Sequence, residues 1–162
     1  MVYRDDNSHL KTPEYLAGEK VSKRASAIYR PKGLPLHRER GLREISVGAW
    51  ERLTWGEILL HWPQQLKYFN ARPDLWTVEG AETAAEVLER GLKTVKAIAA
   101  NHDGEAIALV AHGYIIRVML SHLQGYKLEE MGQTPTGDNT CVASWSMRTG
   151  NCGWCTGMTT AT

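Results

Sequence analysis

The sequence predicts an α/β fold in which helices alternate with the strands of a mostly parallel sheet. Residues 106–111 are a continuous apolar run, which is typical of a strand buried on both faces of a parallel sheet. Apolar residues recur at helical spacing before and after this run, in residues 82–100 and 113–123. Alternation in residues 140–147 favours a further strand. The order helix, strand, helix, strand is the layered pattern of α/β domains.

The bulk composition indicates one ordinary globular domain. The chain has 162 residues, which is enough for a single core and too few for two comfortable domains. Its net charge is +1 and its acids and bases are interspersed, so nothing argues for nucleic acid or an anionic membrane. No apolar run approaches the roughly 18 residues of a membrane span, and residues 1–6 do not resemble a signal peptide. We therefore expect a cytoplasmic protein without nucleic-acid or membrane partners.

The first half of the chain reads as a helix, an irregular segment and a second helical region. Residues 19–29 are a helix candidate, which a proline and a glycine end. Residues 42–50 are expected to be short and extended or irregular. Thr54 can cap the next helix, and Glu57 three residues later completes a capping box. Apolar and aromatic residues between 55 and 76 either belong to the core or form a cap over a ligand.

The second half carries the strongest periodicity. Residues 82–100 repeat apolar side chains every 3.6 residues, and an Asn-His-Asp-Gly sequence then ends the helix. The strand at 106–111 follows within a few residues. The helix at 113–123 begins directly after His112, so this histidine stands between a buried strand and a helix.

His112 therefore occupies a place where α/β proteins bind ligands. In open α/β sheets, ligands collect beyond the carboxyl ends of the strands, and the unpaired N–H groups of the next helix favour an anion. A histidine there can donate to a phosphoryl oxygen, and Gly113 lets a ligand approach the backbone. The alternative for His112 is a core histidine bonded to a neighbour. Arg117, about one turn further on, is either a phosphate ligand or a charge on the solvent face of the helix.

Glu44, in the sequence Leu-Arg-Glu-Ile, is a second candidate. By its pattern alone it is a surface carboxylate. Beside a phosphate site, however, a carboxylic acid suits a general acid that protonates a leaving alkoxide. Together with histidines it would complete phosphoryl transfer through a phosphoenzyme.

Four segments in order resemble the signature of the histidine phosphatases, the phosphoglycerate-mutase-like proteins. They read LREISVGAWE (42–51), GAETAAEVLER (80–90), LVAHGYIIR (109–117) and DNT (138–140). The chain is most similar to the small phosphatase branch that includes alpha-ribazole phosphatases, over residues 25–147. This resemblance implies a three-layer α/β sandwich with a mostly parallel sheet, neither metal nor cofactor, and hydrolysis of a small phosphorylated molecule through a phosphohistidine.

The resemblance also implies roles for single residues. His112 contacts the phosphoryl group, and Glu44 acts as acid and then as base. The backbone N–H of Gly113 and arginines hold the phosphate. Arg24 is a candidate for such an arginine, although its Arg-Ala-Ser-Ala context is too short to match the family element cleanly. Arg52 stands where the family usually has glycine, at a position that flanks the site.

One element of the family is absent from the sequence. The family's first strand carries Arg-His-Gly, whose histidine is the nucleophile, and no Arg-His-Gly occurs in this chain. We therefore expect a sheet lacking its first strand, an impaired or inactive phosphatase, and a possible homodimer that covers the gap. The alternatives are a catalytically dead phosphate-binding or interaction protein, and a small redox or metal protein using Cys152 and Cys155.

The two ends of the sequence suggest a reason. Residues 5–10 read DDNSHL, which resembles the C-terminal tail of the family. The codons that can encode residues 153–162 also permit, in a shifted reading frame, the sequence of residues 1–9. We therefore predict three regions, which are a displaced C-terminal-like tail (1–24), an incomplete histidine-phosphatase-like domain (25–150) and an out-of-frame tail (151–162). On this interpretation the Cys-x-x-Cys sequence is a frame accident.

Overall fold

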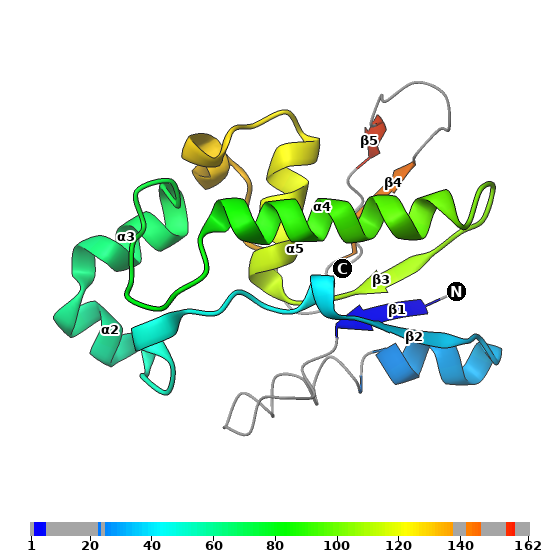
Figure 1. Ribbon diagram of the computed structural model, residues 1–162, viewed down its shortest axis with the longest axis horizontal. Coiled ribbons are helices and arrows are strands. Elements are labelled where there is room, and N and C mark those ends of the chain that lie inside the picture. Colours follow the sequence, from blue (N-terminus) through cyan, green and yellow to red (C-terminus); the bar gives the residue numbers. More distant parts are fainter. Residues whose placement is uncertain (1, 6–22, 24, 138–141, 147–154, 158–162) are drawn as a thin grey trace.

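A small parallel sheet organises the fold of this protein. The computed structural model describes residues 2–5, 23, 25–137, 142–146 and 155–157. Strand β1 (Val2–Asp5) lies between β2 (Leu36–Glu39) and β3 (Ala108–Val110) and runs parallel to both (Figure 1). Val2 is paired with Leu36 on one side and with Ala108 on the other. The fold is therefore mixed α/β, with a parallel sheet as the sequence predicted.

The central position of β1 differs from the expectation. We expected the sheet to lack its first strand, and this is not confirmed, because residues 2–5 hydrogen-bond to strands on both sides. Val and Tyr favour strands, although the resemblance to the family predicts that this segment is part of a tail. Residues 6–22 and 24 lie outside the described residues, so the displaced tail at 1–24 stays a prediction for most of its length.

A second sheet has two antiparallel strands, β4 (Ser144–Ser146) and β5 (Cys155–Gly157). Strand β4 lies inside the predicted strand 140–147, so this prediction holds for residues 144–146, while residues 142–143 lie outside the strand. Strand β5 falls in the predicted out-of-frame tail, most of which lies outside the described residues, as does Cys152.

The two main helices, α4 (Ala84–Ala100) and α5 (Gly113–Leu123), pack against each other. The limits of α5 are those predicted, whereas α4 begins two residues later than predicted. Close approach is possible because α4 carries Gly91, where an added Cβ would lie 2.9 Å from Met119 Sδ of α5. Leu42, Val87 and Ile115 are fully buried in the same core.

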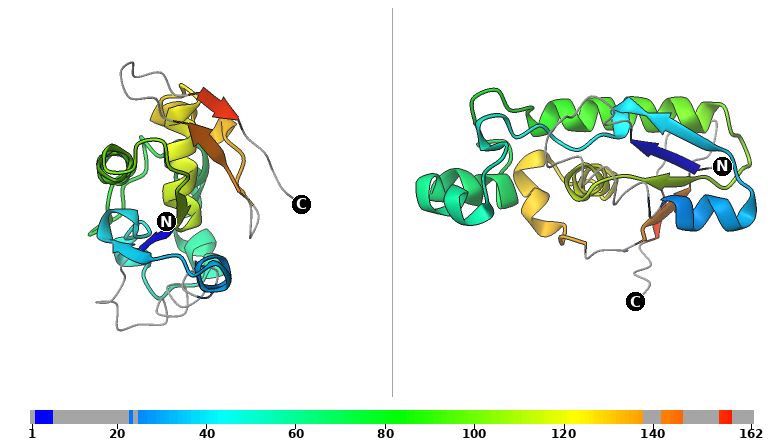
Figure 2. Two further views of the ribbon diagram at one scale, coloured as in Figure 1. Left: turned by 90° about the vertical axis from the view of Figure 1, so that its right-hand side faces the viewer. Right: turned by 90° about the horizontal axis from the view of Figure 1, so that it is seen from below.

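Helices α2 (Trp55–His61) and α3 (Pro63–Ala71) form the end of the molecule away from the sheet (Figure 2). Thr54 and Glu57 form the predicted capping box at the start of α2. Residues 25–29 are also helical, within the predicted helix 19–29. The short 3-10 helices are η1 (Arg30–Lys32), η2 (Arg40–Leu42), η3 (Gly48–Trp50) and η4 (Leu128–Gln133). In this described part of the chain, no helix is both long and apolar enough to cross a bilayer.

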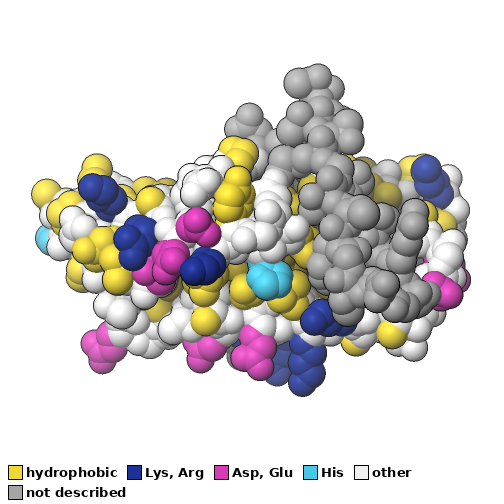
Figure 3. All heavy atoms as spheres, turned by 90° about the horizontal axis from the view of Figure 1, so that it is seen from above, with side chains coloured by type: hydrophobic (Ala, Val, Ile, Leu, Met, Phe, Trp, Pro, Cys, Tyr) yellow, Lys and Arg dark blue, Asp and Glu magenta, His cyan; other side chains and the backbone are white. Residues whose placement is uncertain are grey.

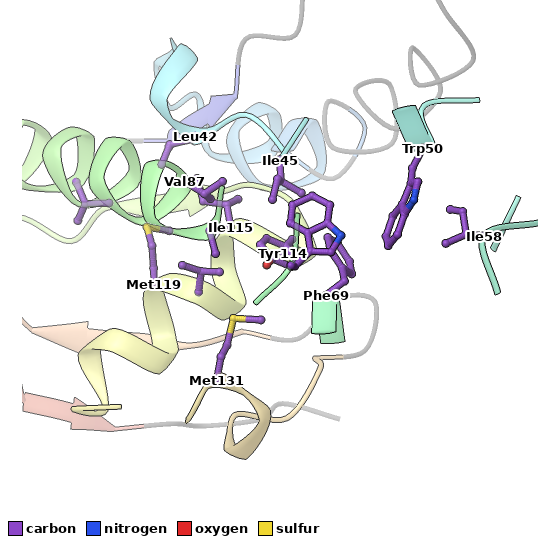
Figure 4. Close-up of a cluster of buried hydrophobic side chains, with 14 of the residues drawn as sticks. Leu42, Ile45, Trp50, Ile58, Phe69, Val87, Tyr114, Ile115, Met119 and Met131 are labelled. Carbon is purple, nitrogen blue, oxygen red and sulfur yellow. The ribbon is translucent and has the colours of Figure 1, made fainter. Parts of the chain in front are cut away.

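The aromatic stretch serves both as core and as surface. Phe69 contacts Trp76 edge-on, with ring centroids 5.0 Å apart. It also stacks on Tyr114, with ring centroids 4.5 Å apart (Figure 4). In contrast, Trp55 is 61% exposed and Leu60 is 75% exposed. Figure 3 shows apolar side chains on the surface at the end formed by α2 and α3. The core alternative therefore holds for Phe69 and Trp76, whereas a cap over a ligand stays a prediction.

Candidate functional site

His112 lies at the junction that the sequence predicted. Strand β3 ends at Val110, His112 is the N-cap residue of α5 with φ −102° and ψ 165°, and the helix begins at Gly113. The apolar run forms the strand, and the extended backbone of His112 turns the chain into the helix. The side chain of His112 is only 7% exposed.

The first turn of α5 is open at Gly113. A Cβ added there would meet no described atom within 4 Å. The first N–H groups of any α-helix lack partners inside the helix, and the helix dipole favours negative charge at this end. The backbone at Gly113 is therefore accessible to an anion.

Glu44 reaches the same helix start from a distant segment of the chain. The Tyr114 N–H donates to Glu44 Oε2 at 3.3 Å, and the Ile115 N–H donates to Oε1 at 3.3 Å. Oε1 also accepts from the N–H of Ile45 at 3.0 Å. The structure thus brings Glu44 and His112 together at the N-terminus of α5. Burial raises the pKa of the Tyr114 hydroxyl, which stays protonated at neutral pH.

A network around Arg90 holds the backbone that carries Glu44. Arg90 Nη1 donates to the carbonyls of Gly41 (2.9 Å) and Arg43 (2.8 Å), and Nη2 donates to the carbonyl of Glu44 (3.2 Å). Glu82 accepts from Arg90 at 2.6 and 2.9 Å, and from Arg43 at 2.8 Å. Partial burial and the neighbouring Arg90 lower the pKa of Arg43. The sequence does not predict this network, because its partners meet only in the folded chain.

The residues that follow Glu44 are held by backbone contacts with residues 79–81. Val47 pairs with Ala81, and the N–H of Ala49 donates to the carbonyl of Glu79 at 2.9 Å. Gly48 has φ +56°, and an added Cβ would collide with the Glu79 carbonyl and the Ala81 nitrogen. The segment that carries Glu44 is therefore fixed on both sides.

Arg117 is held by backbone carbonyls of neighbouring elements. Its side chain is buried and donates to the carbonyls of Thr134 (2.8 Å), Asn70 (2.9 Å) and Met131 (3.2 Å). Burial lowers the pKa of its guanidinium. The alternative of a charge on the solvent face is therefore wrong, because Arg117 is buried. Its role as a phosphate ligand stays a prediction. Arg117 connects α5 to α3 and η4.

Arg24, the strand ends and the groups that could bind a metal complete the description of the site. Arg24 lies outside the described residues, so its phosphate-binding role stays a prediction. The register places Arg4 beside Val110, so β1 and β3 end at the same edge of the sheet, and Asp5 is the last residue of β1. Among the described side chains, no group of three or more His, Cys, Asp or Glu residues is placed to hold a metal ion.

The fold and the site define a class of protein. A buried histidine between a strand of a parallel sheet and the next helix lies where α/β proteins bind ligands, and the start of a helix favours anions. Residues 21–155 match the family model of the histidine phosphatase superfamily (branch 1). The chain belongs to this superfamily, as its four sequence segments predicted.

A curated relative gives a partial match. The metal-independent phosphoserine phosphatase of Arabidopsis thaliana is 29% identical over 79 residues, which are 48% of this chain and 33% of that protein. The matched part of the chain thus spans about a third of the length of this relative.

Solved structures share the fold across almost the whole chain. YhfR of Bacillus stearothermophilus superposes with a TM-score of 0.81 at 22% identity, over 97% of this chain and 71% of that one. The mycobacterial glucosyl-3-phosphoglycerate phosphatase gives 0.82 at 19% identity, over 99% and 77% of the two chains. The alpha-ribazole phosphatase of Shigella flexneri gives 0.74 at 14%, over 99% and 72%. The phosphoglycerate-mutase-like fold is confirmed by these similarities.

Proposed function

We propose that this chain binds inorganic phosphate, or the phosphoryl group of a small phosphomonoester, at the N-terminus of α5. The observation that carries the proposal is the meeting of Glu44 and His112 at this helix start. His112 would donate to a phosphoryl oxygen, and the Gly113 N–H would hold a second one. The phosphatases similar in sequence or fold act, by their names, on small phosphorylated molecules, which supports this substrate class.

We further propose that the chain turns over little or no substrate, and that its sheet belongs to the three-layer sandwich of the family. The resemblance places the nucleophilic histidine in an Arg-His-Gly segment on the first strand. In this chain β1 ends at Asp5 beside the end of β3, and the sequence contains no Arg-His-Gly. With a nucleophile, Glu44 would protonate the leaving oxygen and then activate water.

The test combines binding and turnover. We expect inorganic phosphate to raise the melting temperature of the chain, and p-nitrophenyl phosphate to be hydrolysed little or not at all. His112→Ala should abolish the phosphate-dependent shift, whereas His122→Ala, an exposed histidine at the far end of the same helix, should leave it intact. A chain without any phosphate-dependent shift contradicts the binding site. Robust hydrolysis that His112→Ala abolishes would contradict the proposed impairment and indicate another nucleophile.

A second candidate function is a non-enzymatic phosphate-binding or interaction protein, including a homodimer. It is favoured by the exposed apolar side chains of α2, where Trp55, Leu59 and Leu60 are 61%, 57% and 75% exposed. Such a surface is typical of contact sites. Light scattering tests the homodimer, which Leu60→Glu should convert into a monomer. A monomeric parent chain at micromolar concentration rules it out.

A further inference from the structure

We infer that Glu44 is an internal competitor for the anion site, whose carboxylate an incoming oxyanion displaces when it uses the N–H groups that follow Gly113. The inference rests on the proposed function and concerns the affinity of the same site. Glu44 then determines how tightly the helix start binds phosphate. This role is additional to the acid–base role that the resemblance to the family implies.

The competition follows from a shared set of donors. Tyr114 and Ile115 follow Gly113 in the first turn of α5, and both donate their N–H groups to the Glu44 carboxylate at 3.3 Å. These are the groups that a helix start offers to a phosphate. Two like charges on the same donors repel each other. A phosphoryl group that uses the donors of Tyr114 and Ile115 therefore requires the carboxylate to leave.

The backbone of Glu44 cannot make this movement easily. Its carbonyl accepts from Arg90, and the preceding carbonyls of Gly41 and Arg43 accept from the same guanidinium. Displacement is therefore a rotation of the Glu44 side chain about its χ angles, between staggered positions. The observed rotamer lies on the helix start, and in another the carboxyl group would stand beside the bound oxyanion.

Calorimetric titration of inorganic phosphate into the full chain and three variants tests the inference. Glu44→Ala removes both the charge and the acceptor, whereas Glu44→Gln removes the charge and keeps an acceptor oxygen. Glu51→Gln is the matched control, because Glu51 belongs to the same loop but accepts from the Val47 N–H instead of from α5. We expect about tenfold tighter binding for Glu44→Ala, which is the order of the interaction of one charge with a helix N-terminus. Glu44→Gln should be intermediate, and Glu51→Gln unchanged.

Amide hydrogen exchange without phosphate supplies an independent measurement. First-turn amides usually exchange quickly because they have no partner in the helix. We expect Tyr114 and Ile115 to be protected in the parent chain and to exchange faster in Glu44→Ala. Glu44→Gln preserves the shape of the side chain. If the alanine variant does not fold, calorimetry and hydrogen exchange can therefore still be performed on Glu44→Gln.

The outcomes separate the inference from the proposed function. A chain that binds phosphate, with Glu44→Ala binding no more tightly, overturns the inference alone. An equal gain for Glu51→Gln also overturns it, because general charge repulsion would then explain the effect. If neither the parent nor any variant binds phosphate, the proposed function fails, and the competition fails with it.

Discussion

At the scale of single residues, burial decides what a charged side chain does. Arg117 presents a fixed fork of N–H donors, and three backbone carbonyls accept from it. A buried guanidinium engaged in this way stabilises the fold by satisfying backbone carbonyls. Glu44 is only half-buried and caps a helix start, where an anion can replace it.

Arg117→Met should lower the free energy of unfolding by about 3 kcal/mol, because buried carbonyls lose their donors. Urea denaturation measures the loss. Arg72→Met is the control, since Arg72 is exposed and its ion pair with Asp74 is expected to contribute about 1 kcal/mol or less. Phosphate affinity of folded Arg117→Met should equal that of the parent. A stable variant that has lost phosphate binding would show that Arg117 contributes to the phosphate site.

Arg52→Gly should stabilise the protein by about 1 kcal/mol. Arg52 has φ +70°, the only positive φ among the described residues other than glycines. The left-handed region costs an L-residue roughly 1–2 kcal/mol, which glycine avoids while losing somewhat more chain entropy. The glycine that the resemblance to the family predicts at this position agrees with this backbone conformation. Arg52→Ala, compared in the same thermal denaturation, should show no gain, and an equal gain would assign the effect to the lost charge.

At the scale of elements, caps determine where the helices begin. Thr83 and Glu86 repeat at α4 the reciprocal hydrogen bonds that Thr54 and Glu57 make at α2. The predicted start of α4 at residue 82 was two residues early, because apolar periodicity alone does not locate the cap. Threonine followed three residues later by glutamate is the local signal that does.

The capping box of α4 should make stability depend on acid pH. Hydrogen bonds from the backbone and hydroxyl of Thr83 lower the pKa of Glu86. A carboxyl group with a lower pKa in the folded state contributes stability that is present above its unfolded pKa of about 4.3. This contribution is lost as the pH falls through the folded value.

Glu86→Gln should therefore be less stable than the parent at pH 7, with a smaller loss on acidification from about pH 5 to pH 3. Denaturant unfolding at both pH values checks this. Glu89→Gln, an exposed glutamate outside the capping box, is the control. Parallel pH profiles for Glu86→Gln and the parent would show that the capping hydrogen bonds do not contribute.

At the scale of the whole molecule, the sheet depends on its central strand. Strand β1 is paired on both sides, whereas β2 and β3 each have one partner in the described sheet. Removal of β1 would leave two unpaired edges. The predicted displaced tail, residues 1–24, therefore includes β1, the strand that pairs with both β2 and β3.

Tyr3→Pro should reduce stability by about 3 kcal/mol or more, because proline removes a ladder hydrogen bond from a central strand. Circular dichroism with thermal melting follows the loss. Tyr3→Ile keeps the N–H and a strand-favouring side chain, and should melt near the parent. If both variants melt with the parent, residues 2–5 act as a detached tail, and the central position of β1 is wrong.

Much of the fold and part of the site could be predicted from the sequence. The strand within 106–111, the start of α5 and the cap at Thr54 were correct, because periodicity and capping act within a few residues. The position of His112 follows from the same local signals. The partners of Glu82, Arg90 and Arg117 were not predicted, since most of them lie tens of residues away along the chain.

The sequence by itself determined the α/β class, the family and the place of His112 between a strand and a helix. Only the tertiary structure decided that Glu44 rests on the first turn of α5, that Arg117 is buried and that residues 2–5 fill the centre of the sheet. The reason is physical. Helix and strand preferences are local, whereas a charged side chain acquires its role from the carbonyls, N–H groups and charges that folding brings to it.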